Sequence, residues 1–360
     1  MTATDRSPAP ATAEEFGERM FGAVLGAQLV QSAYLGDRLG YYRALAAAPR
    51  TPGELAAATG TATRYAREWL EHQAVTGVLT CDDPDAPADR RQYRLPPGHA
   101  EVLTDVLSPN HVLPLARMVA GLGRHIDALT GAYRSGGGVS WAAFGTDARE
   151  AQAAANRPLF LGALAREHLP SVPAIRAVLA NGGRVADIGC GYGWSAIGVA
   201  LAHPAVRVDG YDLDAPSIAA ARQNAQDAGV ADRVRFHEAD AGTAAGTYDL
   251  VAAFECIHDM PDPVGVLTTM RRITAPGGVV LVVDERVAET FTAPGDDVEQ
   301  LMYGWSITCC LPDGLSHTPS AGTGTVMRPD TLRGYARSAG FSDVHVLPVE
   351  DQFFRFYRLV

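Results

Sequence analysis

The sequence predicts a mixed α/β protein: a doubly wound, mostly parallel sheet of seven strands with an antiparallel last strand, preceded by a mainly α-helical winged-helix domain. Three observations lead to this prediction. The chain has 360 residues, beyond the length that one hydrophobic core usually serves. Helical runs precede two short strand-like runs before residue 95, and strand-like and helical runs alternate after Asn181. Such alternation is typical of βαβ units in a parallel sheet.

Composition and charge narrow the class of protein. Hydrophobic residues make up 47% of the chain and charged residues 20%, which is typical of a soluble globular protein. Apolar runs such as residues 279–283 are far shorter than the roughly 20 residues that span a bilayer, so we expect no membrane partner. The net charge of −11 disfavours nucleic acid as a partner. Because the first residues show no secretory signal, we expect a cytoplasmic protein.

Three residue types exclude further classes. All 30 basic residues are Arg, and a chain without Lys offers neither the amine of a Schiff-base enzyme nor the lysine of a Walker A phosphate loop. The five cysteines form no CxxC pair, so we expect neither a disulfide framework nor a cysteine-type zinc site. The ten histidines show no HxxxH or HxH spacing, and we expect no metal.

The N-terminal part of the chain predicts a winged helix. Apolar residues recur at helical spacing over residues 13–48 and 62–75, and strand-like runs at 78–80 and 92–95 flank an acidic tip. A helix, a turn, a helix and a hairpin together make a winged helix. The predicted organisation is a disordered start at residues 1–12, a helical and winged-helix domain at 13–150, a linking helix at 151–180 and the sheet domain at 181–360.

The sheet domain alternates strands with helices and ends in two strand-like runs, which we expect to pair antiparallel at the sheet edge. Within it, residues 287–329 interrupt the alternation. A connection of 43 residues is long for a compact domain, so we expect a lid or part of a pocket there. Helices are expected at 109–130, 158–180, 193–203, 215–228, 263–274 and 330–339.

The most informative motif follows the first strand of the sheet domain. After Asp187 come Gly189, Gly191 and Gly193, which open a helix. Glycines at such a turn let a ligand approach the backbone closely. The spacing is GxGxG and not the GxGxxG of dinucleotide enzymes, and the neighbouring acid suits a cationic ligand better than a pyrophosphate. Asp212 ends the next strand, where a carboxylate accepts hydrogen bonds from the two hydroxyls of a ribose.

Five motifs together carry a resemblance to a known family. In chain order they are DIGCGYG, YDLD, FHEADAG, YDLVAAFECIHD and PGGVVLVVDE. Their order and spacing resemble the class I S-adenosylmethionine-dependent methyltransferases over residues 181–360 and, with the winged helix, over nearly the whole chain. The sequence is most similar to two-domain bacterial enzymes that share their plan with plant-type small-molecule O-methyltransferases.

This resemblance implies a Rossmann-like sheet and S-adenosyl-L-methionine as the cofactor, with S-adenosyl-L-homocysteine as its product. It implies that the glycine loop holds the methionine part, that Asp212 binds the ribose and that Asp240 meets the adenine amino group. Phe254 is expected to face the cofactor. The implied cofactor-binding residues are Asp187, Gly189, Gly191, Gly193, Asp212, Leu213, Asp240, Ala241 and Phe254.

The resemblance also implies a general base. His258 follows the fourth strand, where plant-type enzymes carry a His-Asp pair whose His is the base. A neutral His takes the proton of a hydroxyl and makes it a better nucleophile; the alternative is a His that only supports the loop. Asp284 and Glu285 end the fifth strand, where those enzymes place an acid that orients the base, and Glu285 is the preferred candidate. Asp259 and Asp214 are expected to cap the helices that follow them.

The substrate pocket is expected in the helix-like stretch 298–310, inside the long insertion. Aromatic and Met side chains at this spacing are also typical of an ordinary core, which is the competing interpretation. The candidate pocket residues are Met302, Tyr303, Trp305 and Cys309, together with His111 and Arg157.

These observations predict methyl transfer to a hydroxyl of a small aromatic or secondary metabolite, by a homodimer joined through the N-terminal domain. One alternative keeps the cofactor and methylates carbon or nitrogen of an electron-rich aromatic such as indole. A second alternative is a winged-helix DNA-binding regulator that senses S-adenosylmethionine. Residues 1–150 carry 14 Arg against 17 Asp and Glu, which is not a basic DNA-binding composition.

Overall fold

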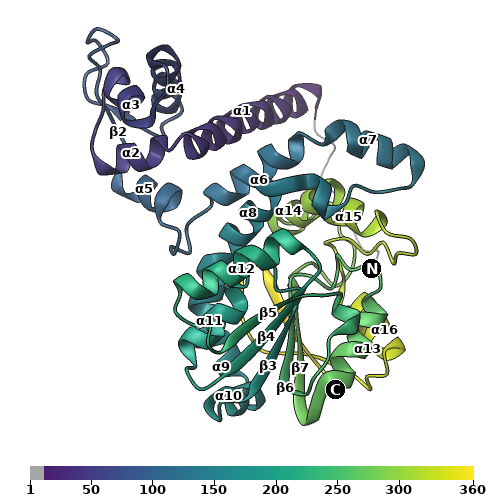
Figure 1. Ribbon diagram of the computed structural model, residues 1–360. Helices are drawn as coiled ribbons and strands as arrows, with labels where there is room; N and C mark the ends of the chain where they lie inside the picture. The colour runs from purple at the N-terminus through teal and green to yellow at the C-terminus, as the bar shows by residue number, and fades with distance from the viewer. Residues whose placement is uncertain (1–11) are drawn as a thin grey trace, which may run out of the picture. The chain divides into compact units, whose positions relative to one another are not determined.

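The computed structural model describes residues 12–360 and divides them into two compact units (Figure 1). The first unit takes in the described residues up to Asp105 and then Asn110–Ala120, and the second takes in Val106–Pro109 and Gly121–Val360. Residues 121–150, which the sequence grouped with the N-terminal domain, lie in the second unit. The predicted disorder of residues 1–12 falls outside the described residues, apart from Thr12.

The first unit is mainly helical. Its helices are α1 (Ala13–Arg38), α2 (Tyr41–Ala47), α3 (Pro52–Thr59), α4 (Thr63–Val75), α5 (Pro97–Thr104) and most of α6 (Leu113–Gly123). The helical run predicted over residues 13–48 is two helices, because Gly40 takes a left-handed φ of 71° after α1. A capping box starts α1, in which the Thr12 and Glu15 side chains each accept from the other's backbone N–H.

Two short strands complete the winged helix. β1 (Thr80–Cys81) and β2 (Tyr93–Arg94) pair antiparallel, as the sequence predicted. In the core of this unit, Trp69 of α4 packs edge-on against Tyr41 and Tyr42 of α2, with ring centroids 4.8 and 5.2 Å apart. Edge-to-face packing of three large rings ties the two helices into one core.

The second unit is built on a sheet with the strand order β5-β4-β3-β6-β7-β9-β8. Its strands are β3 (Arg184–Ile188), β4 (Arg207–Asp212), β5 (Val234–Glu238), β6 (Tyr248–Phe254), β7 (Thr274–Glu285), β8 (Val344–Val346) and β9 (Phe354–Leu359). β3 to β7 are parallel, and β9 is antiparallel to both β7 and β8, so the predicted fold class is confirmed. The chain order reverses at β3, and doubly wound sheets bind ligands beyond the carboxyl ends of the strands at such a point.

Helices cover both faces of this sheet (Figure 1). One face carries α10 (Pro173–Ala180), α11 (Trp194–Ala202), α12 (Ala215–Asp227) and the π-helical segment η1 (Phe160–His168), which runs into the short α9 (Leu169–Ser171). The other face carries α13 (Pro263–Ile273) and α16 (Pro329–Ser338). Each face buries its own apolar core, and no helix within residues 12–360 is long and apolar enough to cross a bilayer.

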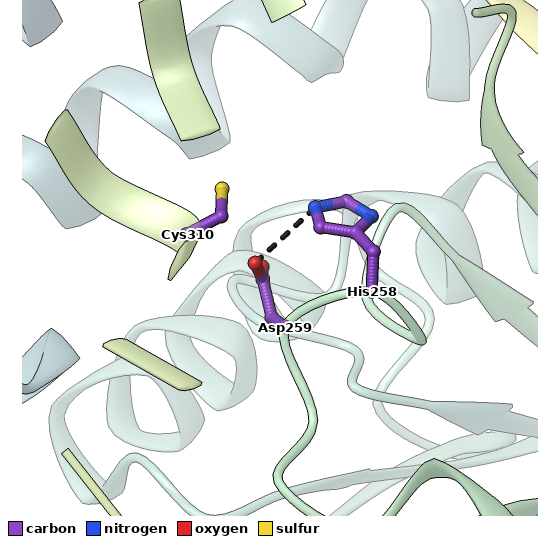
Figure 2. A group of neighbouring side chains, drawn as sticks. All are labelled: His258, Asp259 and Cys310. Carbon is purple, nitrogen blue, oxygen red and sulfur yellow. Dashed lines mark ion pairs between the residues drawn. The ribbon is translucent and has the colours of Figure 1, made fainter. Parts of the chain in front are cut away.

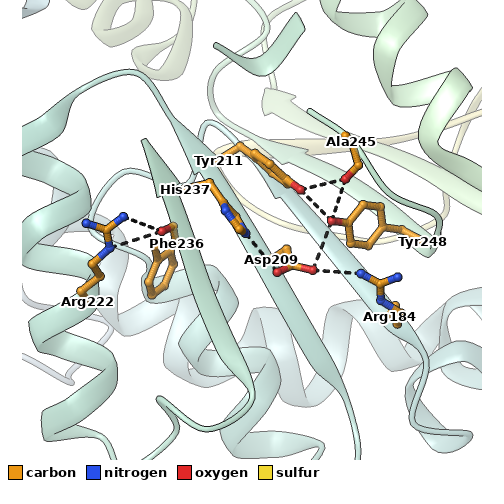
Figure 3. A network of polar contacts seen from close by, with 8 residues as sticks. All are labelled: Arg184, Asp209, Tyr211, Arg222, Phe236, His237, Ala245 and Tyr248. Carbon is orange, nitrogen blue, oxygen red and sulfur yellow. Dashed lines mark hydrogen bonds and ion pairs between the residues drawn. The ribbon is translucent and has the colours of Figure 1, made fainter. Parts of the chain in front are cut away.

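Polar side chains link neighbouring strands, from the amino ends of β3 and β6 to the middle of β4 (Figure 3). The Asp209 carboxylate of β4 accepts from the Tyr248 hydroxyl at 3.1 Å and from the Arg184 guanidinium at 3.2 Å. Tyr211 stacks on His237 of β5, with ring centroids 4.8 Å apart. Contacts from β3, β5 and β6 therefore converge on β4, the strand that ends at the predicted ribose-binding acid.

The remaining helices of the second unit are α7 (Ile126–Ser135), α8 (Trp141–Leu159), α14 (Asp297–Trp305), the π-helical η3 (Ser306–Cys310), α15 (Leu311–Leu315) and the short 3₁₀ turn η2 (Ala241–Thr243). The run predicted over residues 109–130 is broken between α6 and α7. The insertion at 287–329 is helical in part, and the buried Glu299 anchors it by accepting from the Arg328 guanidinium at 2.5 Å.

Candidate active site

The three glycines after β3 differ in why a glycine is present at each position. All three take a positive φ. A Cβ at Gly193 would lie 2.4 Å from the Phe236 ring, and one at Gly189 would lie 2.7 Å from the Cys256 sulfur, so packing requires both glycines. At Gly191 a Cβ would meet no atom within 4 Å. Gly191 is thus the position where the loop leaves open space beside its backbone.

Asp187 is buried in the core beside this loop and does not line its surface. Its side chain is 2% exposed and accepts a hydrogen bond from the Ser195 hydroxyl at 2.5 Å. Burial raises the pKa of Asp187 to about 7; the Ser195 hydrogen bond opposes this rise and the Asp212 charge adds to it. The carboxyl therefore supports the start of α11 from within the core.

Asp212 ends β4 beside the glycine loop. Its carboxylate accepts the backbone N–H of Gly191 and that of Asp214, each at 2.8 Å. Burial raises its pKa, while these backbone hydrogen bonds lower it. A carboxylate has about four acceptor sites, so two remain for ligand hydroxyls. The next residue, Leu213, is 63% exposed and offers an apolar surface at the same place.

Asp214 caps α12, as predicted, by accepting the backbone N–H of Ser217 at 3.0 Å. It also receives both guanidinium donors of Arg149 from α8, at 2.7 and 2.9 Å. The cap and the bidentate pair hold the turn that carries Asp212 and Leu213.

The other predicted cofactor residues lie at neighbouring strand ends. Asp240 is exposed and accepts the backbone N–H of Gly242, with half-buried Ala241 beside it. Phe254 ends β6 but is only 7% exposed, and its ring packs on Phe160 with centroids 5.8 Å apart. The expectation that Phe254 faces the cofactor stays a prediction.

The loop after β6 carries His258, which is 2% exposed. Its Nδ1 lies 2.8 Å from an Asp284 oxygen, and its Nε2 lies 3.2 Å from an oxygen of Asp259 (Figure 2). Glu285 is farther away, at 3.5 Å from Nδ1. Asp284, rather than the preferred Glu285, is therefore the acid that orients the imidazole.

Asp259 does not cap the next helix. α13 begins at Pro263, and its cap is Asp262, which accepts the backbone N–H of Gly265 at 2.8 Å. The expectation for Asp259 was wrong because three residues separate Asp259 from the start of the helix and Asp262 occupies the cap position. Asp259 is instead free to pair with His258.

The carboxylates around His258 control its proton. Burial by itself lowers the pKa of the imidazole, but the charges of Asp259, Asp284 and Glu285 outweigh burial and raise that pKa well above its ordinary value. Burial likewise raises the pKa of Glu285 well above its ordinary value, although the charge of His258 opposes this. The cluster therefore retains protons at pH values where exposed histidine and glutamate would lose them.

Cys310 of η3 faces the same pair from the long insertion (Figure 2). A hydrogen bond with Cys309 and burial raise the pKa of its thiol well above the ordinary value, so the thiol stays neutral. Donor atoms of His258, Asp259 and Cys310 lie within 4.8 Å of one another, as do those of His258, Asp284 and Glu285. A metal ion could use this spacing, but acidic groups around a histidine are common without one, and we assign none.

The predicted pocket residues fall into three places. Met302 and Cys309 are buried, Trp305 is half-buried, and Tyr303 is 38% exposed with its hydroxyl 3.4 Å from the Arg328 guanidinium. Arg157 lies in α8, where its guanidinium stacks over the Trp194 ring at 4.3 Å, beside the glycine loop. His111 belongs to the first unit, where its Nδ1 lies 3.0 Å from the carbonyl of Val102. Their role in binding a substrate stays a prediction.

Sequence reasoning missed the contribution of α8. Arg149, Gln152 and Asn156 are spaced by three and four residues, so they share one face of the helix. Arg149 binds Asp214, whereas Gln152 and Asn156 both donate to Glu255, the residue directly after β6. The available signal was the segment REAQAAAN, in which polar residues recur at helical spacing on an alanine-rich helix.

Two family models match the chain. A model described as a methyltransferase domain matches residues 179–311, which include strands β3 to β7. The chain contains a methyltransferase domain. An Rv2258c-like winged HTH domain matches residues 27–105, so the predicted combination of the two domains is confirmed.

Curated relatives match the methyltransferase domain over part of their length. A ubiquinone biosynthesis O-methyltransferase of Psychrobacter arcticus is 33% identical over 105 residues, which are 28% of this chain and 40% of that protein. A 27-O-demethylrifamycin SV methyltransferase of Amycolatopsis mediterranei is 38% identical over 150 residues, which are 40% of this chain and 55% of that protein. The chain thus spans about half or less of the length of these relatives.

Solved structures share the fold over nearly the whole chain. The mitomycin 7-O-methyltransferase matches with a TM-score of 0.68 at 22% identity, over 96% of this chain and 98% of that one. Human N-acetylserotonin methyltransferase in complex with SAM matches with a TM-score of 0.66 at 20% identity, over 97% and 99%. Because both identities are below 25%, these likenesses show a shared fold.

Proposed function

We propose that the protein transfers a methyl group from S-adenosylmethionine to a hydroxyl of a small molecule, and that His258 takes the hydroxyl proton. The observation that carries this proposal is the contact between two loops of the site. The thiol of Cys256, two residues before His258, donates to the carbonyl of Ile188 at 3.2 Å, at the start of the glycine loop. The predicted base and the predicted cofactor loop are therefore neighbours at the carboxyl ends of the adjacent strands β3 and β6.

The residues at β3 and β4 fit the cofactor. Asp212 keeps acceptor sites for the ribose hydroxyls, Gly191 leaves its backbone open, and Leu213 offers apolar surface for the adenine. When bound, S-adenosylmethionine supplies an electrophilic methyl group on a sulfonium. We propose the remaining cofactor contacts at Asp240 and Ala241, which follow the neighbouring strand β5 at the start of η2.

Acidic side chains lie at both ring nitrogens of His258, as expected for a histidine that acts as a base. Asp284 accepts the Nδ1 proton and so leaves Nε2 as the atom that takes a proton from the acceptor hydroxyl. Asp259 holds that same Nε2 in its protonated form, so an acceptor must displace Asp259 before Nε2 can act. We propose Met302, Trp305 and Cys309 of the insertion as the apolar side of the acceptor pocket, with Tyr303 and Arg157 at its polar positions.

The direct test measures methyl transfer with a labelled donor. The protein is incubated with S-adenosylmethionine carrying a deuterated methyl group and with a panel of phenols, aliphatic alcohols and indoles. Mass spectrometry then locates the label on oxygen, nitrogen or carbon. Label on carbon or nitrogen would replace the hydroxyl acceptor with the indole-type alternative, and a protein that does not bind S-adenosylhomocysteine in calorimetry would refute the proposal.

We further propose a homodimer that forms through α1. This helix exposes Phe16, Met20, Phe21, Val24 and Leu25, each at least half exposed. So many exposed apolar side chains on one helix are unusual on a free surface, and burying them against a second copy gains roughly 25 cal/mol per Å². The double variant Phe21→Glu/Leu25→Glu should dissociate the dimer in light scattering, whereas a monomeric wild-type protein would exclude it.

The winged helix is proposed to serve this assembly rather than DNA. On α4, Arg64 pairs with Glu68 and Arg67 with Glu71, so both arginines face acids one turn later. Such a helix offers no positive stripe for phosphates. The five free cysteines fit a reducing cytoplasm. Sequence-specific duplex binding at physiological salt would favour the regulator instead.

A further inference from the structure

The residue directly after β6 has an unusual backbone. Glu255 takes φ 52°, the one positive φ of a non-glycine residue among residues 12–360. Its N–H donates to the carbonyl of Val283 at 2.8 Å. Non-glycine residues in this region are strained, and surrounding contacts must hold them there. Such strain is common at functional sites, which makes Glu255 a candidate functional residue.

The Glu255 side chain is held by one oxygen only. Its Oε2 accepts the amide N–H of Gln152 at 3.1 Å and that of Asn156 at 3.0 Å, both from α8. Its Oε1 is buried and has no hydrogen-bond partner among residues 12–360. A buried carboxyl oxygen without a partner costs free energy, so its presence calls for a reason. The two amide hydrogen bonds to Oε2 fix the direction in which Oε1 points.

Glu255 lies next to the glycine loop. The following residue, Cys256, donates to the Ile188 carbonyl, and its sulfur closes off the space beside Gly189. The backbone of Glu255 therefore adjoins the loop that the proposed function assigns to the methionine part of the methyl donor. That part carries two cationic groups, but a sulfonium has no hydrogen to donate, whereas an α-ammonium has three.

We propose that Oε1 of Glu255 accepts a hydrogen bond from the α-ammonium of the methyl donor, and that Gln152 and Asn156 act as positioning residues that aim this oxygen. The inference rests on the proposed function, because it assigns a contact to the same cofactor. It gives α8 a role that neither the glycine loop nor the ribose-binding acid supplies: recognition of the amino-acid end.

The electrostatics agree with this geometry. Burial raises the pKa of Glu255 to about 8; Asn156 and the charge of His258 lower it, and the charges of Asp284 and Asp351 raise it. Without a ligand the carboxyl is therefore mostly protonated at neutral pH. An ammonium partner stabilises the carboxylate, so binding should release a proton.

The test compares two ligands that differ only at the amino-acid end. S-adenosylhomocysteine carries the α-ammonium, and 5′-methylthioadenosine lacks the whole amino-acid part. Glu255→Gln should weaken S-adenosylhomocysteine by about 10- to 100-fold in calorimetry, as expected for one charge-assisted hydrogen bond, and leave methylthioadenosine unchanged. Asn156→Ala should show the same selective loss in weaker form, and Glu167→Gln, at an exposed acid of η1, serves as the matched control.

Two further measurements separate recognition from folding. Glu255→Gly removes the carboxyl and relieves the positive φ, so it should fold at least as well as the wild type and still lose the selective affinity. Calorimetry in buffers of different ionisation enthalpy should show proton release with wild-type protein and S-adenosylhomocysteine, and none with Glu255→Gln. Equal losses for both ligands, or no loss for S-adenosylhomocysteine, would overturn the inference. Wild-type protein that binds neither ligand would instead refute the proposed function.

Discussion

The two halves of the candidate site are built in opposite ways. At the ends of β3 and β4, the acids are satisfied by the backbone: Asp212 accepts two N–H groups and Asp214 caps a helix. At the ends of β6 and β7, buried oxygens of Glu255, Asp284 and Glu285 have no hydrogen-bond partner. The first half is complete without a ligand, whereas the second is complete only when protons or ligand groups are added.

This difference teaches where binding and chemistry separate. Satisfied acids with fixed geometry suit recognition of a constant ligand, because little reorganises on binding. Of the unsatisfied acids, Asp284 and Glu285 lie beside His258 and suit proton transfer, because small changes in their surroundings move protons. Glu255 is the exception in this half, because we assign it to the ligand. If the halves are separate, a substitution in one half should lower turnover, and a substitution in the other should lower cofactor affinity.

The largest effect is expected at His258. His258→Ala removes the proposed proton acceptor and should lower turnover by about 10²–10⁴-fold. Affinity for S-adenosylhomocysteine should stay near the wild-type value, because we assign the imidazole no direct contact with the cofactor. His345→Ala, at an exposed histidine of β8, is the control. Near-normal turnover in His258→Ala would mean that positioning alone drives the reaction.

Asp212 should show the converse behaviour. Asp212→Ala loses the acceptor for two ribose hydroxyls, and one such bond alone, at about 1.5–3 kcal/mol, corresponds to a loss of about 10- to 100-fold in affinity for S-adenosylhomocysteine. Calorimetry measures this, with Asp232→Ala, at an exposed acid, as control. Unchanged affinity in Asp212→Ala would refute the assignment of the ribose to β4.

A smaller effect, in pH dependence, is expected at Asp259. His258 is protonated below its raised pKa and becomes a base above it, so the rate should rise with pH through a midpoint above the ordinary range of histidine. Asp259→Asn removes a charge that raises this pKa and should move the midpoint to lower pH. Rate profiles at saturating cofactor measure it. A midpoint that stays in place would show that Asp259 does not hold the Nε2 proton.

The smallest effect on the site is expected from the polar contacts between strands β4 and β6, which lie away from the carboxyl ends of the strands. Tyr248 is 2% exposed, and its hydroxyl lies within hydrogen-bond distance of Asp209 (Figure 3). Tyr248→Phe should lower the free energy of unfolding by about 1–3 kcal/mol and leave turnover and cofactor affinity near wild type. Denaturant titration measures this, and Tyr65→Phe, at a residue that is 79% exposed, should change stability little. A large loss of cofactor affinity in Tyr248→Phe would place these contacts in the binding site itself.

Local sequence was sufficient for the fold and for the cofactor half of the site. The period of apolar residues predicted the alternation of strands and helices, and glycines with an acid at each strand end predicted the loop after β3 and the position of Asp212. These features depend on residues within one βα turn, because strand ends and caps are decided by short-range geometry. The cap of the helix after Asp259 was assigned to the wrong acid, since Asp259 and Asp262 both precede the helix.

Tertiary structure decided the other half. Asp284 lies at 2.8 Å from Nδ1 of His258 and Glu285 at 3.5 Å, and only the folded loop shows which of these two adjacent acids is the nearer. Glu255 acquired its amide partners from α8, about 100 residues earlier in the chain. The sequence by itself thus determined the elements and the loop that suits the cofactor. Only the folded chain decided which buried acids share protons, because their pKa values depend on burial and on charges from distant segments.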